Sequence, residues 1–168
     1  MEHRLGQLLV TRGVLTTAQL SLALERQECT GEPLGLICER WFGVPPQEIE
    51  AAWAAQYAGL TRTIDPSVEV YEERALELVT RRQAWQFRIL PLRFDTHELM
   101  MATTQRHLPR ALRFATSVIG VPAFFVLAEP EALGRALCRH YPLPGMTPGS
   151  VDDDLLQHYA PRGVCCDE

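Results

Sequence analysis

The N-terminal third of this chain contains an internal repeat with a fixed offset of 29 residues. Residues 4–27 read RLGQLLVTRGVLTTAQLSLALERQ, and residues 33–56 read PLGLICERWFGVPPQEIEAAWAAQ. At this offset, identical or apolar residues align: Leu5 with Leu34, Gly6 with Gly35, Leu20 with Ile49, Ala23 with Ala52, Leu24 with Trp53 and Gln27 with Gln56. A repeat of this length is one supersecondary unit that buries its apolar face against the neighbouring copy.

Each copy is predicted to form a short helix, a turn that contains glycine and a longer helix. In the first copy, Thr16 and Gln19 form a capping box at the start of the longer helix. In the second copy, Gly43 ends the short helix, and Pro45-Pro46 stands where the next helix starts. Helix pairs of this kind also occur in DNA-binding proteins, but the candidate recognition helices carry only Arg26, so DNA recognition is disfavoured.

The hydrophobic period changes in the second half of the chain. A helix is predicted over residues 67–80, strands over 87–94 and 98–102 with a turn at 95–97, a helix over 106–118, a strand over 121–127 and a helix over 129–141. This order predicts an α+β fold: a helical tandem-repeat subdomain (residues 1–60), a small three-stranded α/β subdomain (61–141) and a flexible acidic tail (142–168) rich in Pro, Gly and Asp.

The basic residues of this chain exclude several kinds of enzyme. Sixteen arginines account for the whole Lys+Arg total, so the chain has no lysine and no P-loop, Schiff-base or Ser/Lys chemistry. The histidines are scattered, and the five cysteines lack paired metal spacings. We therefore expect no enzyme, no metal site and no cofactor.

The formal net charge of -5 is unevenly distributed, with -3 over residues 1–60, +2 over 61–141 and -4 over 142–168. Duplex binding needs a basic footprint, which neither the near-neutral body nor the acidic tail supplies, so duplex nucleic acid is not an expected partner. No signal sequence precedes the repeat, and no apolar run approaches the roughly 20 residues that cross a bilayer. We predict a cytoplasmic protein with no direct membrane insertion.

The first copy carries the pattern RLGxxLxxxGxxxxxxLxxxLxxQ, which resembles the MshEN domain. This is the N-terminal domain of type II secretion ATPases of the GspE type and of some type IV pilus assembly ATPases. All eight defining positions are occupied, by Arg4, Leu5, Gly6, Leu9, Gly13, Leu20, Leu24 and Gln27. The segments FRILPLRF, HELMMATT and VPAFFVLAEPEALGRAL also resemble the α/β half of that family, so the resemblance covers residues 1–141.

The resemblance implies a nucleotide-binding site for cyclic di-GMP, in which each copy holds one half of the two-fold symmetric ligand. An arginine offers planar donors to a phosphate or a guanine edge, a glycine lets a ligand approach the backbone, and leucines form an apolar bed for purines. The predicted site residues are Arg4, Leu5, Gly6, Leu9, Leu20, Leu24 and Gln27 in the first copy and Leu34, Gly35, Ile49, Trp53 and Gln56 in the second. Leucines at these spacings are also needed to pack two helix pairs, so Arg4 and Gln27 carry the functional prediction.

The second copy departs from the family pattern. Pro33 stands where arginine is expected, Cys38 and Trp53 where leucine is expected, and Gly43 comes one position late. Residues 101–104 read MATT where members of the family often read MADP, so a carboxylate that could contact guanine is missing. Two outcomes stay open: the ligand is bound in altered form with Trp53 stacking on a base, or the scaffold is kept and the ligand is lost.

The alternative function is a protein-interaction adaptor that docks on a secretion or pilus membrane platform or another signalling partner. The family's motor needs a P-loop lysine, so this chain is either a free-standing domain, which the acidic tail favours, or a fragment of a longer ATPase. A further hypothesis is that the acidic tail binds the face formed by Arg106, Arg110 and Arg113 and thereby regulates the site, because their charges are opposite.

Overall fold

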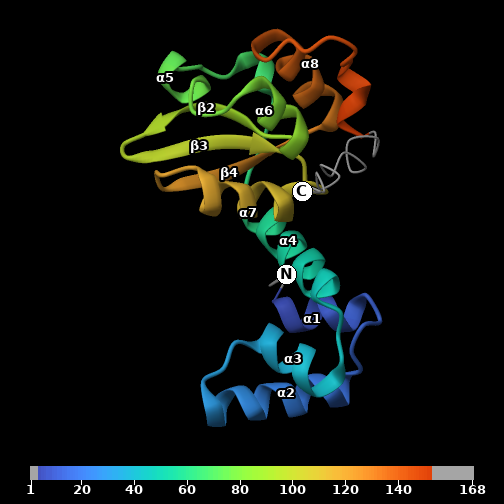
Figure 1. Ribbon diagram of the computed structural model, residues 1–168. Helices are drawn as coiled ribbons and strands as arrows, with labels where there is room; N and C mark the ends of the chain where they lie inside the picture. The colour runs from blue at the N-terminus through green and yellow to red at the C-terminus, as the bar shows by residue number, and fades with distance from the viewer. Residues whose placement is uncertain (1–3, 153–168) are drawn as a thin grey trace, which may run out of the picture. The chain divides into compact units, whose positions relative to one another are not determined.

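In the computed structural model, which describes residues 4–152, the repeat folds into four helices (Figure 1). They are α1 (Leu5–Thr11), α2 (Thr17–Thr30), α3 (Leu34–Phe42) and α4 (Pro46–Leu60). Helices α1 and α3 begin 29 residues apart, and so do α2 and α4. The helix pair predicted for each copy is therefore present in both.

The predicted helix boundaries of the repeat are set by local hydrogen bonds and backbone angles. The Thr16 hydroxyl accepts a bond from the Gln19 N–H group at 3.2 Å, and the Gln19 side-chain oxygen accepts one from the Thr16 N–H group at 2.9 Å. Gly43 follows α3 in the left-handed region at φ 64°, which glycine adopts without a Cβ clash. Pro46 is the first residue of α4. The capping box and both helix ends are confirmed.

The core of the four helices follows the same repeat. Its buried members are Leu9, Leu15, Ala23, Ile37, Cys38, Val44 and Ala52. Six of them form three pairs at the offset of 29: Leu9 with Cys38, Leu15 with Val44 and Ala23 with Ala52. The backbone repeats as well, because the Leu15 N–H group donates to the Leu9 carbonyl and the Val44 N–H group donates to the Cys38 carbonyl, both at 3.3 Å.

Helix α1 packs against α4, and α2 packs against α3. Exchanging the two copies converts the first contact into the second, so the four helices have an approximate two-fold relation. The chain divides into two compact units between Arg62 and Thr63, and the helices belong to the first, which we call the repeat unit.

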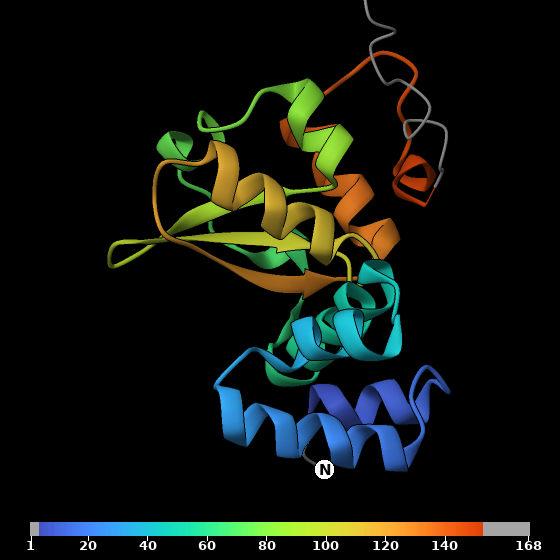
Figure 2. The same ribbon diagram turned by 60° about the horizontal axis from the view of Figure 1, so that its bottom comes forward.

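The second unit, which we call the α/β unit, contains a sheet of four strands (Figure 2). They are β1 (Thr63–Ile64), β2 (Leu90–Asp95), β3 (Glu98–Thr103) and β4 (Ala123–Ala128), in the order β1-β4-β3-β2. Strands β1, β4 and β3 are parallel, and β2 is antiparallel to β3. The mixed helix and sheet class is confirmed. The predicted three-stranded sheet lacks β1, because two residues are too short to show strand alternation.

The helices of the α/β unit are α5 (Glu73–Leu76), α6 (Arg81–Phe87), α7 (Leu108–Val118) and α8 (Pro130–His140), with 3-10 turns η1 (Pro66–Val68) and η2 (Pro148–Val151). The single helix predicted over residues 67–80 is wrong. Thr80 caps α6 through Gln83 instead of ending a helix. Arg88, at φ 54°, ends α6, so the strand that was predicted from residue 87 begins at Leu90.

Residues 142–152 are packed, which differs from the flexible segment predicted for residues 142–168. Val151 is fully buried, and Gly134 of α8 lies so close to the Pro148 carbonyl that a Cβ would collide with it. The Arg88 guanidinium donates to the carbonyls of Ser150 at 2.8 Å and Val151 at 3.0 Å. Composition did not indicate that residues 142–152 are packed, because they are held largely through backbone atoms. The rest of the predicted tail, residues 153–168, lies outside the described residues.

Candidate functional site

The predicted site residues fall into two groups by their position in the repeat unit. Seven lie in or against its interior: Leu5, Gly6, Leu9, Leu20, Leu34, Gly35 and Ile49. Five reach its surface: Arg4, Leu24, Gln27, Trp53 and Gln56. The structure therefore brings together the apolar members that pack the helices and leaves five residues with atoms that a ligand could contact.

Gly6 and Gly35, the glycines at the third position of each copy, have a packing role. A Cβ on Gly6 would collide with the end of the Leu20 side chain, and one on Gly35 would lie 2.9 Å from the Ile49 Cγ2 atom. These two contacts are the same contact in the two copies, because Leu20 and Ile49 occupy the same repeat position. The Leu20 and Ile49 side chains thus occupy the space that a Cβ at Gly6 or Gly35 would need, which is the physical reason for glycine at this position.

The surface positions of the two copies correspond in exposure but differ in chemistry. Leu24 on α2 is 43% exposed, and Trp53, at the same repeat position on α4, is 39% exposed. Gln27 and Gln56 follow one helical turn later, and both are half-buried. Arg4 is exposed directly before α1, whereas exposed Pro33 takes the same place before α3. Each copy presents an apolar group and an amide in register, and only the first adds a guanidinium.

Two further aromatic residues, Tyr57 and Trp41, are not among the predicted site residues and also lie on this unit. The rings of Trp53 and Tyr57 are 5.6 Å apart between centroids, one helical turn apart on α4. The Arg26 guanidinium lies over the Trp41 ring at 4.3 Å, and Trp41 is 58% exposed. The i, i+4 spacing of Trp53 and Tyr57 could have indicated the first pair from the sequence. The second joins α2 to α3 and depends on the tertiary fold.

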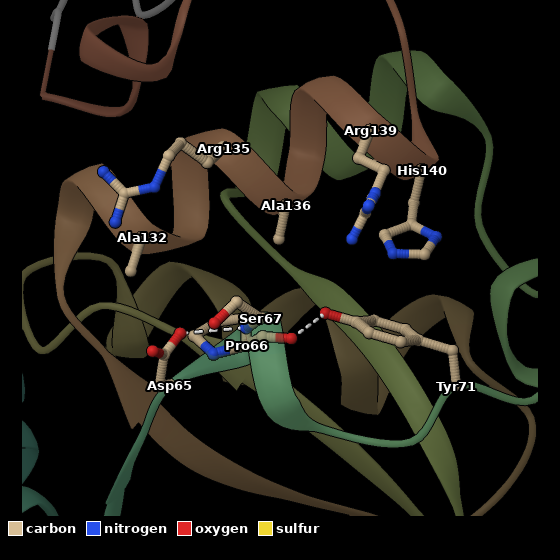
Figure 3. A pocket seen from close by; sticks show the side chains of 9 residues that line it. All are labelled: Asp65, Pro66, Ser67, Tyr71, Ala132, Arg135, Ala136, Arg139 and His140. Atoms are coloured by element: carbon tan, nitrogen blue, oxygen red, sulfur yellow. Dashed lines mark hydrogen bonds between the residues drawn. The ribbon is translucent and has the colours of Figure 1, made fainter.

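The α/β unit contains a cavity of about 280 Å³ between α8 and the segment that begins at β1 (Figure 3). Figure 3 shows Arg139 and His140 of α8 pointing toward Tyr71 across it, whereas Arg135 extends along α8 on the side of Asp65. The Tyr71 hydroxyl donates to the Pro66 carbonyl at 2.6 Å, and its ring stacks on His140 with centroids 4.0 Å apart. Burial raises the pKa of Tyr71 to about 12, so this phenol is a hydrogen-bond donor and not a base at neutral pH.

A second cavity, of about 460 Å³, lies at the carboxyl ends of the parallel strands β3 and β4, beside Thr63 at the start of β1. This edge of a parallel sheet is where ligands commonly bind in α/β proteins. Thr63, Thr104, Gln105, Arg106 and Glu129 supply its polar lining. No sequence motif indicated this cavity, because its residues come from three separate strand ends.

Thr103, which stands where the family's MADP has its carboxylate, and the adjacent Thr104 both make hydrogen bonds inside the α/β unit. The Thr103 hydroxyl donates to the Arg88 carbonyl at 2.7 Å, and the Thr104 hydroxyl lies 2.7 Å from the His107 Nδ1 atom. Burial lowers the pKa of His107 to about 4, helped by the charges of Arg88 and Arg106, so this imidazole is neutral at pH 7. These groups stabilise the unit and supply no carboxylate to a guanine.

Two kinds of site are not found in the described part of the chain. Residues 4–152 contain no group of three or more His, Cys, Asp and Glu side chains placed to hold a metal ion. In the same range, no helix combines the length and the apolar composition that spanning a bilayer requires.

Comparison with known families gives a match to the MshEN domain over residues 55–147, more than half of the chain. An α+β chain with this match is an MshEN-type domain, and the protein belongs to the MshEN domain family. The matched range begins near the end of α4 and covers most of the described α/β unit. The family predicted from residues 4–27 is thus confirmed, while the repeat residues that suggested it lie almost entirely outside the matched range.

Several known proteins are similar to this chain. The type IV pilus assembly ATPase PilB of Thermus thermophilus is 31% identical over 139 residues, which are 83% of this chain and 15% of PilB. A structure of MshE with cdg is 26% identical, covers 82% of this chain and 99% of its own, and has a TM-score of 0.46. The N-terminal domain of XpsE is 20% identical, with coverage of 83% and 95% and a TM-score of 0.45.

Proposed function

We propose that the repeat unit is a non-enzymatic, cytoplasmic receptor domain that binds cyclic di-GMP. The observation that carries the proposal is the pair of exposed apolar side chains, Leu24 and Trp53, at the same position of two copies that pack by reciprocal contacts. Cyclic di-GMP consists of two identical halves. A protein surface that presents the same position twice therefore suits a ligand that presents the same base twice.

In this proposal the five surface residues contact different parts of the ligand according to their chemistry. The Arg4 guanidinium donates in a planar fork to a phosphate or to the O6 and N7 atoms of guanine. Leu24 and Trp53 cover purine faces, and Tyr57 places a second ring beside Trp53. The amides of Gln27 and Gln56 both donate and accept. MshE, a homologue described in a structure with cdg, makes cyclic di-GMP the ligand to test first.

Binding in the second copy is proposed to depend on stacking, because Pro33 has no donor where Arg4 has five. Loss of a charge-assisted bond costs about 1.5–3 kcal/mol, whereas stacking of a base on an aromatic ring contributes about 1–3 kcal/mol. The two contributions are of similar size. Trp53 can therefore offset much of the missing guanidinium.

Calorimetric titration of the whole chain with cyclic di-GMP tests this function. We expect the wild type to bind, Arg4→Ala to bind about 10- to 100-fold more weakly, and Trp53→Ala to lose a comparable factor. Arg40→Ala is the matched control, because Arg40 is an exposed arginine of α3 that pairs with Glu32 at 3.0 Å. The wild type is titrated at about 100 µM protein, far above the dissociation constant expected of a signalling receptor. Absence of a heat of binding at this concentration would reject the proposal.

A second candidate is an adaptor that docks on a platform protein of a secretion or pilus system. It is favoured by the exposed apolar side chains of α2 and α3, since Leu22 is 57% exposed and Trp41 58%. Surfaces of this kind mark protein contacts when they are contiguous. Adding cyclic di-GMP separates the two functions: a receptor gains melting temperature with ligand concentration, and an adaptor that has lost the ligand does not.

A further inference from the structure

Three arginines line one side of the start of α7 in the α/β unit. Arg106, Arg110 and Arg113 recur at helical spacing, and we call this set the arginine face. Neither α6 nor α7 contains an acidic residue, and the first turn of α7 has none. Arg110 lies over the Phe87 ring at 5.3 Å, and Phe87 in turn stacks on Phe114, so the middle of the face rests on a rigid aromatic pair.

The last described residues of the chain arrive at this face. The turn η2 is fixed by the buried Val151 side chain and by the bonds from Arg88 to the carbonyls of Ser150 and Val151. The next carbonyl, that of Asp152, accepts a bond from the Arg106 guanidinium at 3.3 Å. The Asp152 charge also acts on His107, the residue that precedes α7. Residue 152 is therefore held beside the N-terminal end of α7.

The chain continues from this point with two more aspartates. Residues 153–168 contain Asp153, Asp154, Asp167 and Glu168 against Arg162. An extended chain advances about 3.3–3.6 Å per residue, so the two residues after Asp152 can extend past Arg106, which precedes α7, toward Arg110 in its first turn. Carboxylates placed here also meet the positive end of the α7 dipole.

We propose that the arginine face is a binding surface for an acidic peptide segment, and that its occupant is the chain's own Asp153-Asp154 pair. Exposed ion pairs between separate molecules are weak. Here the bonds from Arg88 and Arg106 hold residues 150–152 beside the face, so the aspartates act at an effective concentration in the millimolar range or above. The segment then covers the face and competes with any other acidic partner. This proposal concerns the α/β unit and is independent of ligand binding by the repeat.

Arginine modification by phenylglyoxal in the whole chain, followed residue by residue by mass spectrometry, tests the proposal. In the double variant Asp153→Asn/Asp154→Asn we expect Arg110 and Arg113 to react about threefold faster or more, since a tethered contact is lost. High salt should produce the same increase in the wild type. Arg40 and Arg135, whose ion pairs lie elsewhere, should react at unchanged rates.

A matched control removes the same charge from the far end of the segment. Asp167→Asn/Glu168→Gln should leave the rates at Arg110 and Arg113 unchanged, because these acids are not next to Asp152. Equal rates in the wild type and in the Asp153→Asn/Asp154→Asn variant would overturn the proposal. So would an equal acceleration by the control variant, which would show a general charge effect instead of a docked pair.

Discussion

The described core of the repeat unit consists of apolar side chains and one thiol, whereas the core of the α/β unit also contains Arg88, Thr103, Thr104 and His107. Each of these four makes hydrogen bonds within the α/β unit. In the repeat unit, burial and the neighbouring Glu39 raise the pKa of the Cys38 thiol. The two units are thus stabilised by different kinds of interaction.

This difference in core composition determines which residues of each unit can vary. An apolar core requires only volume and pattern, so the two copies of the repeat could keep their helices while their surface residues diverged from Arg4 to Pro33 and from Leu24 to Trp53. A polar core requires every partner in place. In the α/β unit those partners include the carbonyls of Ser150 and Val151, so the core fixes where the C-terminal segment leaves the unit.

The largest effect is expected from truncating a core side chain, which should destabilise one unit and not the other. Leu9→Ala should destabilise the repeat unit by about 3 kcal/mol, because it removes a fully buried side chain and leaves a cavity. Cys38→Ala, at the same repeat position, removes one atom and should cost about 1 kcal/mol or less. Hydrogen exchange of the α1–α4 amides and the β2–β4 amides in the whole chain measures both units at once. Equal loss of protection in the two units would contradict their separation.

Acid should destabilise the α/β unit selectively. The unfolded chain binds a proton at His107 near pH 6.5, but the folded unit does so only near pH 4. Between these values the unfolded state holds more protons, so the free energy of unfolding falls as the pH drops, by about 2 kcal/mol from pH 7 to pH 5. Burial also lowers the pKa of His140, which acts in the same direction.

The pH prediction has its own control. His107→Asn keeps a polar group near Thr104 and should flatten most of the slope between pH 7 and pH 5 in denaturant titrations of the α/β unit. The protection of the α1–α4 amides should change little over the same range, once intrinsic exchange rates are corrected for pH. A slope of the same size in both units, or one that His107→Asn leaves intact, would show that another group is responsible.

The smallest expected effect is one that both units share. Thr16 caps α2 through Gln19, and Thr80 caps α6 through Gln83, with the same bonds at 3.2 Å and 2.9 Å. Thr16→Ala and Thr80→Ala should each cost about 1 kcal/mol, because one N–H group at each helix start loses its acceptor. Exchange measurements should place the first loss in the repeat unit and the second in the α/β unit. A loss in the other unit would mean that the two are energetically coupled.

Much of the repeat unit could be predicted from the sequence, because its signals are local. The capping box at Thr16, the glycine at residue 43 and the offset of 29 specify helix starts and ends within a few residues of themselves. The role of Gly6 could not be predicted, since only the packed structure shows that Leu20 fills the space where a Cβ would be.

The α/β unit was less predictable because its decisive contacts join distant residues. Strand β1 is defined by its pairing with β4, more than fifty residues later in the chain. Arg88 holds carbonyls at residues 150 and 151, and His107 owes its lowered pKa to burial. The site residues follow the same rule: the sequence indicated which positions repeat, but only the packed structure shows which of them pack the helices together.

The proposed function requires equivalent surface positions of the two copies to bind the two halves of one cyclic di-GMP molecule. Amide NMR spectra of the whole chain, recorded during titration with cyclic di-GMP, test it most directly. We expect the amides around Leu24 and Gln27 on α2 and around Trp53 and Gln56 on α4 to shift together, with one common dissociation constant. Shifts in one copy only, shifts confined to the cavities of the α/β unit, or no shifts at saturating ligand would contradict it.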